Sequence, residues 1–210
     1  MCFNQNWRYK ENSIVQFNIR GLIKNYYNLL TYITTFKPDI VCLQETQIGP
    51  NSRLKYNKPI EFRGYNMYRK DCEPGKWGVA ILVKEDIPQN LINIRSSLEQ
   101  VSVKVFYKGK TLSVTSFYLP PQIRFTINEL EILNRHLLHN KIILTDANAH
   151  HSLWGDPRIC PRGRVLVEFI AANNLVTLNK DEPTYISPTT GNPSFIDVSI
   201  ISPKLVLDAD

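Results

Sequence analysis

IILTDANAHHSLWG, residues 142–155, carries three apolar residues directly into an Asp, an Asn and two of the four histidines of the chain. A short apolar run of this kind is typical of a buried strand. Ionisable groups that follow such a strand lie where the sheet ends, and this edge is the usual ligand site of a layered α/β protein. The stretch therefore predicts a strand that presents a functional site at its end.

The composition allows one domain with a full core. The chain has 210 residues, 43% of them hydrophobic, and no apolar run long enough to span a membrane. Its beginning lacks the apolar segment of a signal peptide. The four cysteines lie far apart without a CxxC pair, which argues against a zinc site or a disulfide framework and indicates reduced thiols in a nuclear or cytoplasmic protein. The net charge of +6 permits binding to a polyanion.

The apolar pattern alternates between strand and helix periods, without repeats or linkers. Strands are expected over 13–19, 40–43, 65–68, 78–83, 101–107, 111–118, 142–145, 175–178 and 195–201, and helices over 24–36, 126–138 and 165–172. The first strand, helix and strand favour a parallel pair with a crossover helix, and Lys108-Gly109-Lys110 predicts a hairpin turn. We expect a single α/β domain of two packed mixed β-sheets flanked by helices, in four layers.

Polar residues stand at or just past the ends of several of these strands. They are Asn18, Glu45, Tyr118, Asp146, Asn148 and Asp197. Since strand ends often converge on one edge of a layered fold, these side chains are expected to form one site. Oxygen ligands without thiolates or a histidine cluster suit a hard cation such as Mg²⁺ or Mn²⁺. Such a metal with carboxylates indicates phosphate chemistry, in which a carboxylate activates water.

Each of these residues also has a purely structural interpretation. Asn18 before Arg-Gly is typical of a turn, Glu45 could cap a helix, and Tyr118 before two prolines could be a packed aromatic. Asp146 and Asn148 are harder to explain in this way, because residues i and i+2 of an extended segment point to the same side. An Asx turn would also bring these two together.

Five short motifs, in this order along the chain, resemble those of the endonuclease/exonuclease/phosphatase superfamily, which has the DNase-I-like fold. They are FNIRG at 17–21, LQET at 43–46, SFYLPP at 116–121, DANAHH at 146–151 and SFID at 194–197. The resemblance extends over residues 14–201. Each motif is short, but all five occur in order, and each falls at a strand end where a polar group is expected.

Within the superfamily the chain resembles the apurinic-like endonuclease of non-LTR retrotransposons. The residues that carry this resemblance are NAHH at 148–151, LWG at 153–155, RG at 162–163, NNL at 173–175, LN at 178–179 and PT at 183–184. The resemblance implies a Mg²⁺-dependent endonuclease, with Mn²⁺ as a substitute, that nicks double-stranded DNA. The 3′-hydroxyl then primes synthesis by a reverse transcriptase fused to the domain. The region 181–193 is expected near a loop that selects the target.

The resemblance also implies a role for each central residue. Glu45 is the principal metal ligand, and Asn18 helps to place the metal or its water. Asp146 orients or deprotonates the attacking water. Asn148 holds both Asp146 and the scissile phosphate, and Tyr118 donates its hydroxyl to a phosphate oxygen.

At the periphery, the resemblance implies that Asp197 holds the imidazole of a catalytic histidine and that His151 and Arg162 contact DNA. Thr145 and Ala147 replace the usual Gly and Phe of the fourth motif, at positions that pack rather than react. The family's terminal Ser-Asp-His motif does not occur in this sequence. We therefore expect a domain truncated before its last strand, with the loss of such a preorganised donor costing on the order of 10²–10³ in rate.

Two other functions stay open at this point. Another phosphoesterase on the same fold, such as an inositol-phosphate phosphatase, a sphingomyelinase or a deadenylase, would share the five motifs, but the AHH-x-x-WG run argues against it. A catalytically impaired nucleic-acid-binding domain would also fit the absent histidine motif. Such a protein would bind DNA in a salt-sensitive manner and never nick it.

Overall fold

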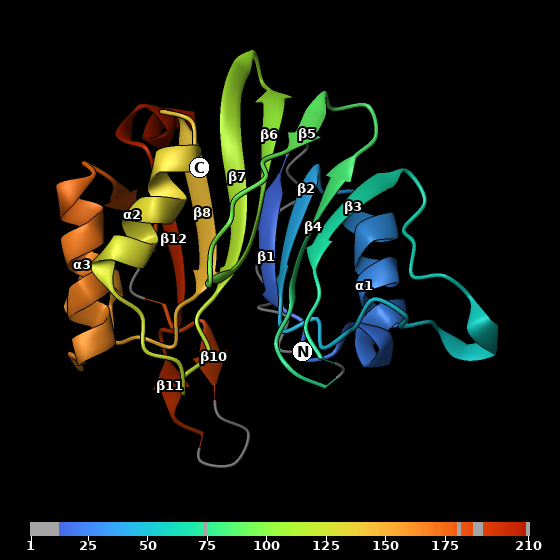
Figure 1. Cartoon of the computed structure of the whole chain (residues 1–210), viewed down its shortest axis with the longest axis horizontal. Helices are drawn as coiled ribbons and strands as arrows, with labels where there is room; N and C mark the ends of the chain where they lie inside the picture. The colour runs from blue at the N-terminus through green and yellow to red at the C-terminus, as the bar shows by residue number, and fades with distance from the viewer. Residues whose placement is uncertain (1–12, 74, 180–181, 187–190, 209–210) are drawn as a thin grey trace.

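Two β-sheets packed face to face form the centre of the molecule, and helices cover the outer face of each sheet (Figure 1). The structure is a computed structural model that describes residues 13–73, 75–179, 182–186 and 191–208. From one side to the other, the layers are helix α1, a four-stranded sheet, a six-stranded sheet, and helices α2 and α3. The predicted four-layer α/β architecture is confirmed.

The four-stranded sheet is built on the predicted strand–helix–strand unit. Its order is β1 (Ile14–Asn18), β2 (Ile40–Gln44), β4 (Val79–Lys84) and β3 (Tyr65–Lys70). β1 and β2 are parallel, and α1 (Leu22–Phe36) connects them as the crossover helix. The helix begins two residues earlier than predicted, directly after Gly21, whose φ of 99° lies in the region that favours glycine.

The six-stranded sheet contains the stretch that predicted the site. Its order is β5 (Gln89–Leu91), β6 (Glu99–Tyr107), β7 (Lys110–Tyr118), β8 (Lys141–Asp146), β12 (Asp197–Ile201) and β9 (Val176–Thr177). β6 and β7 form the predicted hairpin, and Lys108 and Gly109 both take the positive φ that a two-residue turn requires. β7 and β8 are parallel, whereas β12 runs antiparallel to β8, so that Asp146 lies opposite both Tyr118 and Asp197.

Helices α2 (Ile127–His136) and α3 (Pro161–Ala172) cover the outer face of the six-stranded sheet. α3 begins four residues before the predicted start, because Pro161 fits its first turn and the Cys160 sulfur accepts a hydrogen bond from the Gly163 amide.

The short hairpin of β10 (Tyr185–Ile186) and β11 (Pro193–Ser194) projects beyond the sheets (Figure 1) and was not predicted. The 3₁₀ turns are Lys55–Asn57, Ser152–Trp154 and Pro203–Asp208. Residues 181 and 187–190 of the expected target-selecting region lie outside the described residues.

Three apolar layers hold the sandwich together. Cys42, Ile81 and Val114 are fully buried between the sheets. Leu29 is buried on the inner face of α1, and Trp154 is buried in the layer beneath α3. In the part of the chain that the structure describes, no helix is both long and apolar enough to cross a bilayer. The polar strand ends therefore lie on a scaffold that is closely packed on both sides.

The docking of α3 depends on a glycine. A Cβ at Gly163 would lie 2.2 Å from the carbonyl oxygen of His150, a backbone atom that cannot rotate away. We expect Gly163→Ala to lower the free energy of unfolding by about 1–3 kcal/mol through overpacking, although alanine is the better helix former by roughly 1 kcal/mol. Urea denaturation measures this change. The exposed Glu168→Ala on the same helix is the control, and a Gly163→Ala variant as stable as the control would contradict the close packing.

Candidate active site

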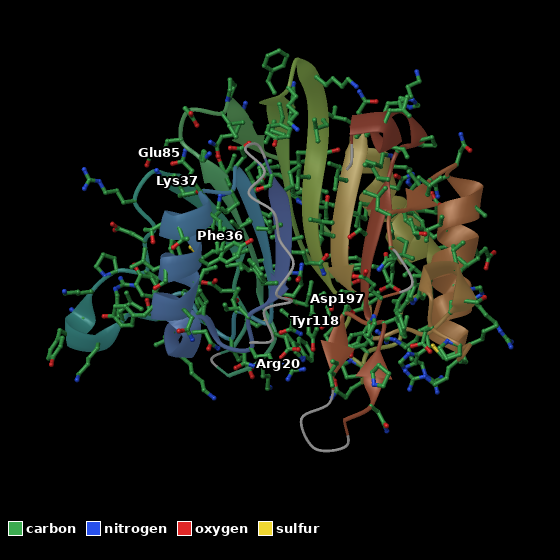
Figure 2. All side chains as sticks on the ribbon, turned by 180° about the vertical axis from the view of Figure 1, so that it is seen from behind. Arg20, Phe36, Lys37, Glu85, Tyr118 and Asp197 are labelled. Atoms are coloured by element: carbon green, nitrogen blue, oxygen red, sulfur yellow. The ribbon has the colours of Figure 1, made fainter. Side chains whose placement is uncertain are left out.

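Polar residues from both sheets meet at one edge of the sandwich. Asn18 ends β1, Glu45 follows β2, Tyr118 and Asp146 end β7 and β8, and Asp197 begins β12. Figure 2 shows Arg20, Tyr118 and Asp197 gathered there, at the end away from Phe36, Lys37 and Glu85. The structure thus brings together residues up to 179 positions apart, from Asn18 to Asp197, as the strand-end argument predicted.

One side-chain amide connects the two sheets at this edge. The Nδ2 of Asn18 donates to Glu45 Oε1 and to Asp146 Oδ2, each over 2.6 Å. Glu45 is held for this contact by a left-handed backbone, with φ of 51°, directly after β2. Its carbonyl oxygen also accepts the amide of Gly21, at the start of α1. The turn after β1 and the turn after β2 are therefore fixed to each other and to Asp146.

Burial raises the pKa of two carboxyl groups at this site, Asp146 and Asp197. Asp146 is 1% exposed, and burial, followed by the negative charge of Asp197, raises its pKa, while the hydrogen bond from Asn18 opposes this shift. Burial likewise raises the pKa of Asp197, against hydrogen bonds from Thr184 and Gln16 and the charge of Arg20. The site therefore concentrates negative charge in a region of low dielectric constant, where a proton or a cation is favoured.

Asn148 lies in a turn and not in an extended segment. Its φ is 43°, and its backbone amide donates to Asp146 Oδ1 over 3.2 Å. Of the two local interpretations of the pair, the Asx turn is confirmed and the extended segment is wrong, because the chain leaves the sheet at Ala147. The side-chain Nδ2 of Asn148 donates to the carbonyl oxygen of Leu119 over 3.2 Å, which connects the ends of β7 and β8.

Tyr118 remains a hydroxyl donor at this site. Burial raises its pKa well above the usual value of a tyrosine, and the negative charges of Glu45 and Asp146 raise it further. A tyrosinate is thus disfavoured at any physiological pH, and the phenol keeps its proton beside the carboxylates.

The guanidinium of Arg162 holds the two loops that carry the site. It donates from Nε to Asn148 O, from Nη1 to Ile123 O, and from Nη2 to both Leu119 O and Ala147 O. Four of its five N–H groups are therefore used on backbone carbonyls. Arg162 fixes the segments after β7 and β8, and its predicted contact with DNA stays a prediction.

His151, the other predicted DNA contact, also has a structural role. Its Nδ1 accepts the backbone amide of Leu153 over 3.1 Å and so caps the 3₁₀ turn Ser152–Trp154. Its ring lies 5.5 Å from the ring of Trp154, centroid to centroid. Contact between this side chain and DNA is not tested by the structure.

Two glutamines that the sequence did not single out also support the site. Gln16, on the same side of β1 as Asn18, donates to Asp197 Oδ1 over 3.2 Å, and the i, i+2 relation to Asn18 was a usable signal. Gln44 is fully buried between the sheets, where its Nε2 donates to Ser116 Oγ and to Leu144 O. A glutamine in an otherwise apolar strand implies a buried partner, but the sequence does not identify it.

The donor set fits a hard divalent cation. Within the described ranges, no three His, Cys, Asp or Glu side chains form a preassembled metal-binding group. The Glu45 carboxylate and the Asn18 amide nevertheless lie together, with the amide nitrogen facing the carboxylate. Carboxylate and amide oxygens are the ligands that Mg²⁺ and Mn²⁺ prefer. The mutual repulsion of Glu45, Asp146 and Asp197 is the electrostatic condition that a divalent cation relieves.

The sequence and the fold of this chain are similar to those of known endonuclease and retrotransposon proteins. A family model described as endonuclease-reverse transcriptase matches residues 112–209, from β7 through β12. The RNA-directed DNA polymerases from mobile element jockey of Drosophila melanogaster and Drosophila funebris are 29% and 28% identical to the chain, over 81% and 87% of its length. The chain is thus similar in sequence to this endonuclease-reverse transcriptase family and to these mobile-element proteins.

Solved structures confirm the DNase-I-like fold of the chain. The endonuclease domain of TRAS1, a telomere-specific non-LTR retrotransposon, superposes with a TM-score of 0.73 at 21% identity, over 93% of this chain and 87% of that one. The AP endonuclease LMAP from Leishmania major gives 0.68 at 14% identity, over 93% and 80%. The chain spans about a fifth of the length of the jockey proteins, 18% and 20% respectively.

The role of Arg162 is testable through its geometry. Arg162→Lys keeps the charge but cannot reach four carbonyl groups, so buried acceptors lose their donor. We expect the free energy of unfolding to fall by at least about 2 kcal/mol, measured by urea denaturation. Arg164→Lys, an exposed position on the same helix, should change it by less than about 0.5 kcal/mol. Equal stability of the two variants would show that Arg162 is not a structural clamp.

Proposed function

We propose that the chain is a metal-dependent DNA endonuclease domain of a non-LTR retrotransposon protein. The observation that carries the proposal is the Asn18 amide, which holds Glu45 and Asp146 together beside Tyr118. Carboxylates, an amide and a phenol at one strand-end edge are the groups needed to activate water against a phosphodiester. Similarity to the endonuclease-reverse transcriptase family supports the same reaction class.

In this proposal Asp146 orients the attacking water and receives its proton. Its raised pKa suits a group that accepts a proton near neutral pH. Asn148 is held in place by Asp146 and Leu119, with its side chain at the edge of the site, where it positions the scissile phosphate. The protonated hydroxyl of Tyr118 donates to a phosphate oxygen. Asp197, whose Oδ1 accepts from Gln16, would hold the imidazole of a catalytic histidine.

Glu45, with Asn18, would hold the divalent ion, Mg²⁺ or in its place Mn²⁺. When bound, such an ion stabilises negative charge on the phosphate oxygens. Asn18 now directs its amide nitrogen at both carboxylates, so rotation of this amide is what would present its oxygen to a cation. Gln47 Nε2, 3.4 Å from the other Glu45 oxygen, supports the carboxylate from the opposite side.

Double-stranded DNA is the proposed substrate, and a nick with a 3′-hydroxyl is the proposed product. The formal net charge of +6 supports binding to a polyanion. The relatives in sequence are named as RNA-directed DNA polymerases and are about five times as long as the chain. We therefore propose that the domain is fused to a reverse transcriptase, and that it acts on DNA inside the cell.

Nicking of supercoiled plasmid with Mg²⁺ tests the reaction. We expect nicking by the chain, a loss of at least 10²-fold in Asp146→Asn, and a loss on the order of 10²-fold in Tyr118→Phe, which removes one phosphate donor. Tyr65→Phe is the matched control, because its hydroxyl donates to the carbonyl of Pro38, outside the site. Salt-sensitive DNA binding with no nicking under any metal would favour a binding domain without catalysis. Nicking that survives Asp146→Asn would exclude the proposed site.

Metal binding can be measured without activity. We expect Mg²⁺ or Mn²⁺ to raise the melting temperature of the chain, since a ligand at a hundredfold excess over its Kd stabilises by about 2.7 kcal/mol. Glu45→Gln should abolish most of this rise, and the exposed Glu168→Gln should keep it. A rise of equal size in Glu45→Gln would place the cation elsewhere.

A further inference from the structure

We propose that Arg158 and His150, oriented by the buried carboxylate of Asp156, form a second phosphate-binding subsite beside the catalytic centre. This subsite would bind a backbone phosphate of the DNA strand that flanks the scissile bond. The inference rests on the proposed function and extends it to residues outside the Asn18, Glu45 and Asp146 site.

Asp156 is fully buried, and its partners among the described residues are a histidine and an arginine. Arg158 Nε donates to Oδ1 over 3.0 Å, and Arg158 Nη2 donates to Oδ2 over 2.9 Å. This two-point contact fixes the plane of the guanidinium. Burial alone would raise the pKa of Asp156, but the hydrogen bonds from Arg158 and His150 bring it well below the usual range. The carboxylate thus stays ionised and holds the side chains of Arg158 and His150 in place.

The guanidinium is exposed on the side opposite its anchor. The Arg158 side chain is 56% exposed, whereas that of Asp156 is 0% exposed. An anion that approaches from solvent therefore meets the arginine and not the carboxylate. Since Nε and Nη2 make the contacts with Asp156, Nη1 is left with two donors for a phosphate oxygen.

His150 is oriented by the same carboxylate. Its Nδ1 lies 2.7 Å from Asp156 Oδ2, and the histidine side chain is 27% exposed. When Nδ1 donates to the carboxylate, Nε2 carries a proton for a phosphate oxygen only in the imidazolium form, in which both ring nitrogens are donors. The backbone of His150 is held as well, because its amide donates to the sulfur of Cys160 and its carbonyl accepts the amide of Cys160.

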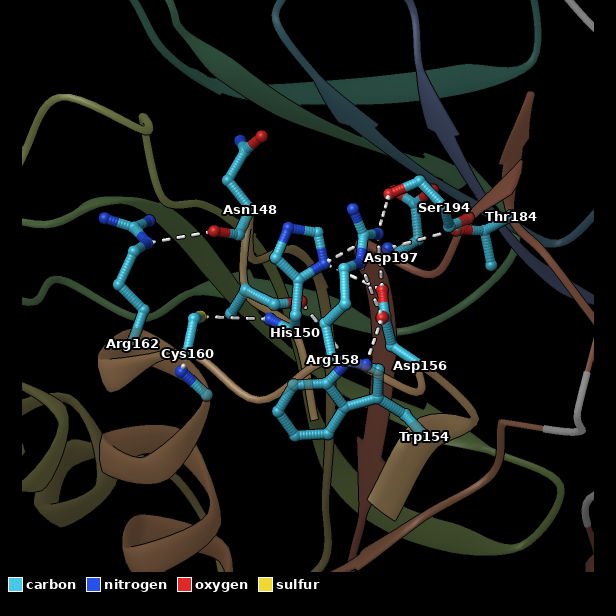
Figure 3. Close-up of polar contacts among 12 residues, drawn as sticks. Asn148, His150, Trp154, Asp156, Arg158, Cys160, Arg162, Thr184, Ser194 and Asp197 are labelled. Atoms are coloured by element: carbon cyan, nitrogen blue, oxygen red, sulfur yellow. Dashed lines mark hydrogen bonds and ion pairs between the residues drawn. The ribbon is translucent and has the colours of Figure 1, made fainter. Parts of the chain in front are cut away.

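The pair lies between the two segments that border the catalytic centre. His150 follows Asn148 by two residues, and Arg158 Nη2 reaches Ser194 Oγ on β11, three residues before Asp197, over 3.4 Å. Figure 3 shows Arg158 in contact with Asp156 and Ser194, and His150 in contact with Asp156. A strand that presents its scissile phosphate at Asp146 and Asn148 would therefore place a neighbouring phosphate near Arg158.

The test is the salt dependence of duplex binding, measured by fluorescence anisotropy with Ca²⁺ between 50 and 200 mM salt. The main variant is the double substitution Asp156→Asn with Arg158→Gln, which leaves no unpaired buried charge and keeps the net charge at +6. Loss of one phosphate contact should lower the slope of log K against log salt by about 0.9. His150→Asn, whose amide can replace Nδ1 but not Nε2, should weaken binding about tenfold and melt like the parent chain.

Arg135→Gln, an exposed arginine at the end of α2, is the control for loss of a charge and should keep the parent slope. Ser194→Ala removes the contact with β11 and should also keep the slope. If Ser194→Ala lowers the slope as much as the double variant does, Arg158 acts by positioning the hairpin and the subsite is wrong. If the parent chain binds and nicks DNA but the double variant keeps the full slope, only the subsite is overturned. If the parent chain does not bind duplex DNA, the proposed function fails as well.

Discussion

One hydrogen-bonding group, the amide of Asn18, joins the two sheets where the site forms. It lies within 2.6 Å of a carboxylate oxygen from each sheet, Glu45 on one and Asp146 on the other. Without this donor, two anionic groups would face each other across a junction that is closed to water on the Asp146 side. The relative position of the two sheets at this edge and the geometry of the site are therefore set by the same contact.

Hydrogen bonds from neighbouring residues keep this junction rigid. Gln44 and Ser116 connect the sheets immediately below the site, since Ser116 also donates to the carbonyl of Leu43. Arg162 holds the loops after β7 and β8 by their carbonyls. Displacement of a loop would break these hydrogen bonds and leave further buried polar groups unpaired, so partial displacement of a loop is disfavoured. The loops at the site are consequently part of the folded core.

Apolar periodicity predicted most of the architecture because long strands and helices leave a strong local signal. The parallel strand–helix–strand unit, the 101–118 hairpin and the polar strand ends all followed from it. β5, β10 and β11 were not predicted, since strands of two or three residues leave little periodic signal. Arg162 was assigned to DNA by resemblance, but its four carbonyl partners come from segments up to 43 residues away, which sequence alone cannot identify. The turn at Asn148 likewise depends on where the chain leaves the sheet, and both local interpretations fitted the spacing.

A concentration of carboxylates at this edge works against folding, and the layers around it offset that cost. Burial raises the pKa of Asp146 and Asp197, which means that their ionised forms are less stable here than in water. The molecule retains them in place because the strands that carry them, β8 and β12, are paired over five residues and buried between apolar layers on both faces. The same arrangement gives the site its chemical character. Water and salt would screen the charges of a surface cluster of acids. This cluster keeps a strong affinity for a proton or a divalent cation because burial of Asp146 reduces that screening. Apolar packing of the scaffold thus keeps the carboxylates buried, and their burial strengthens the electrostatic field at the site.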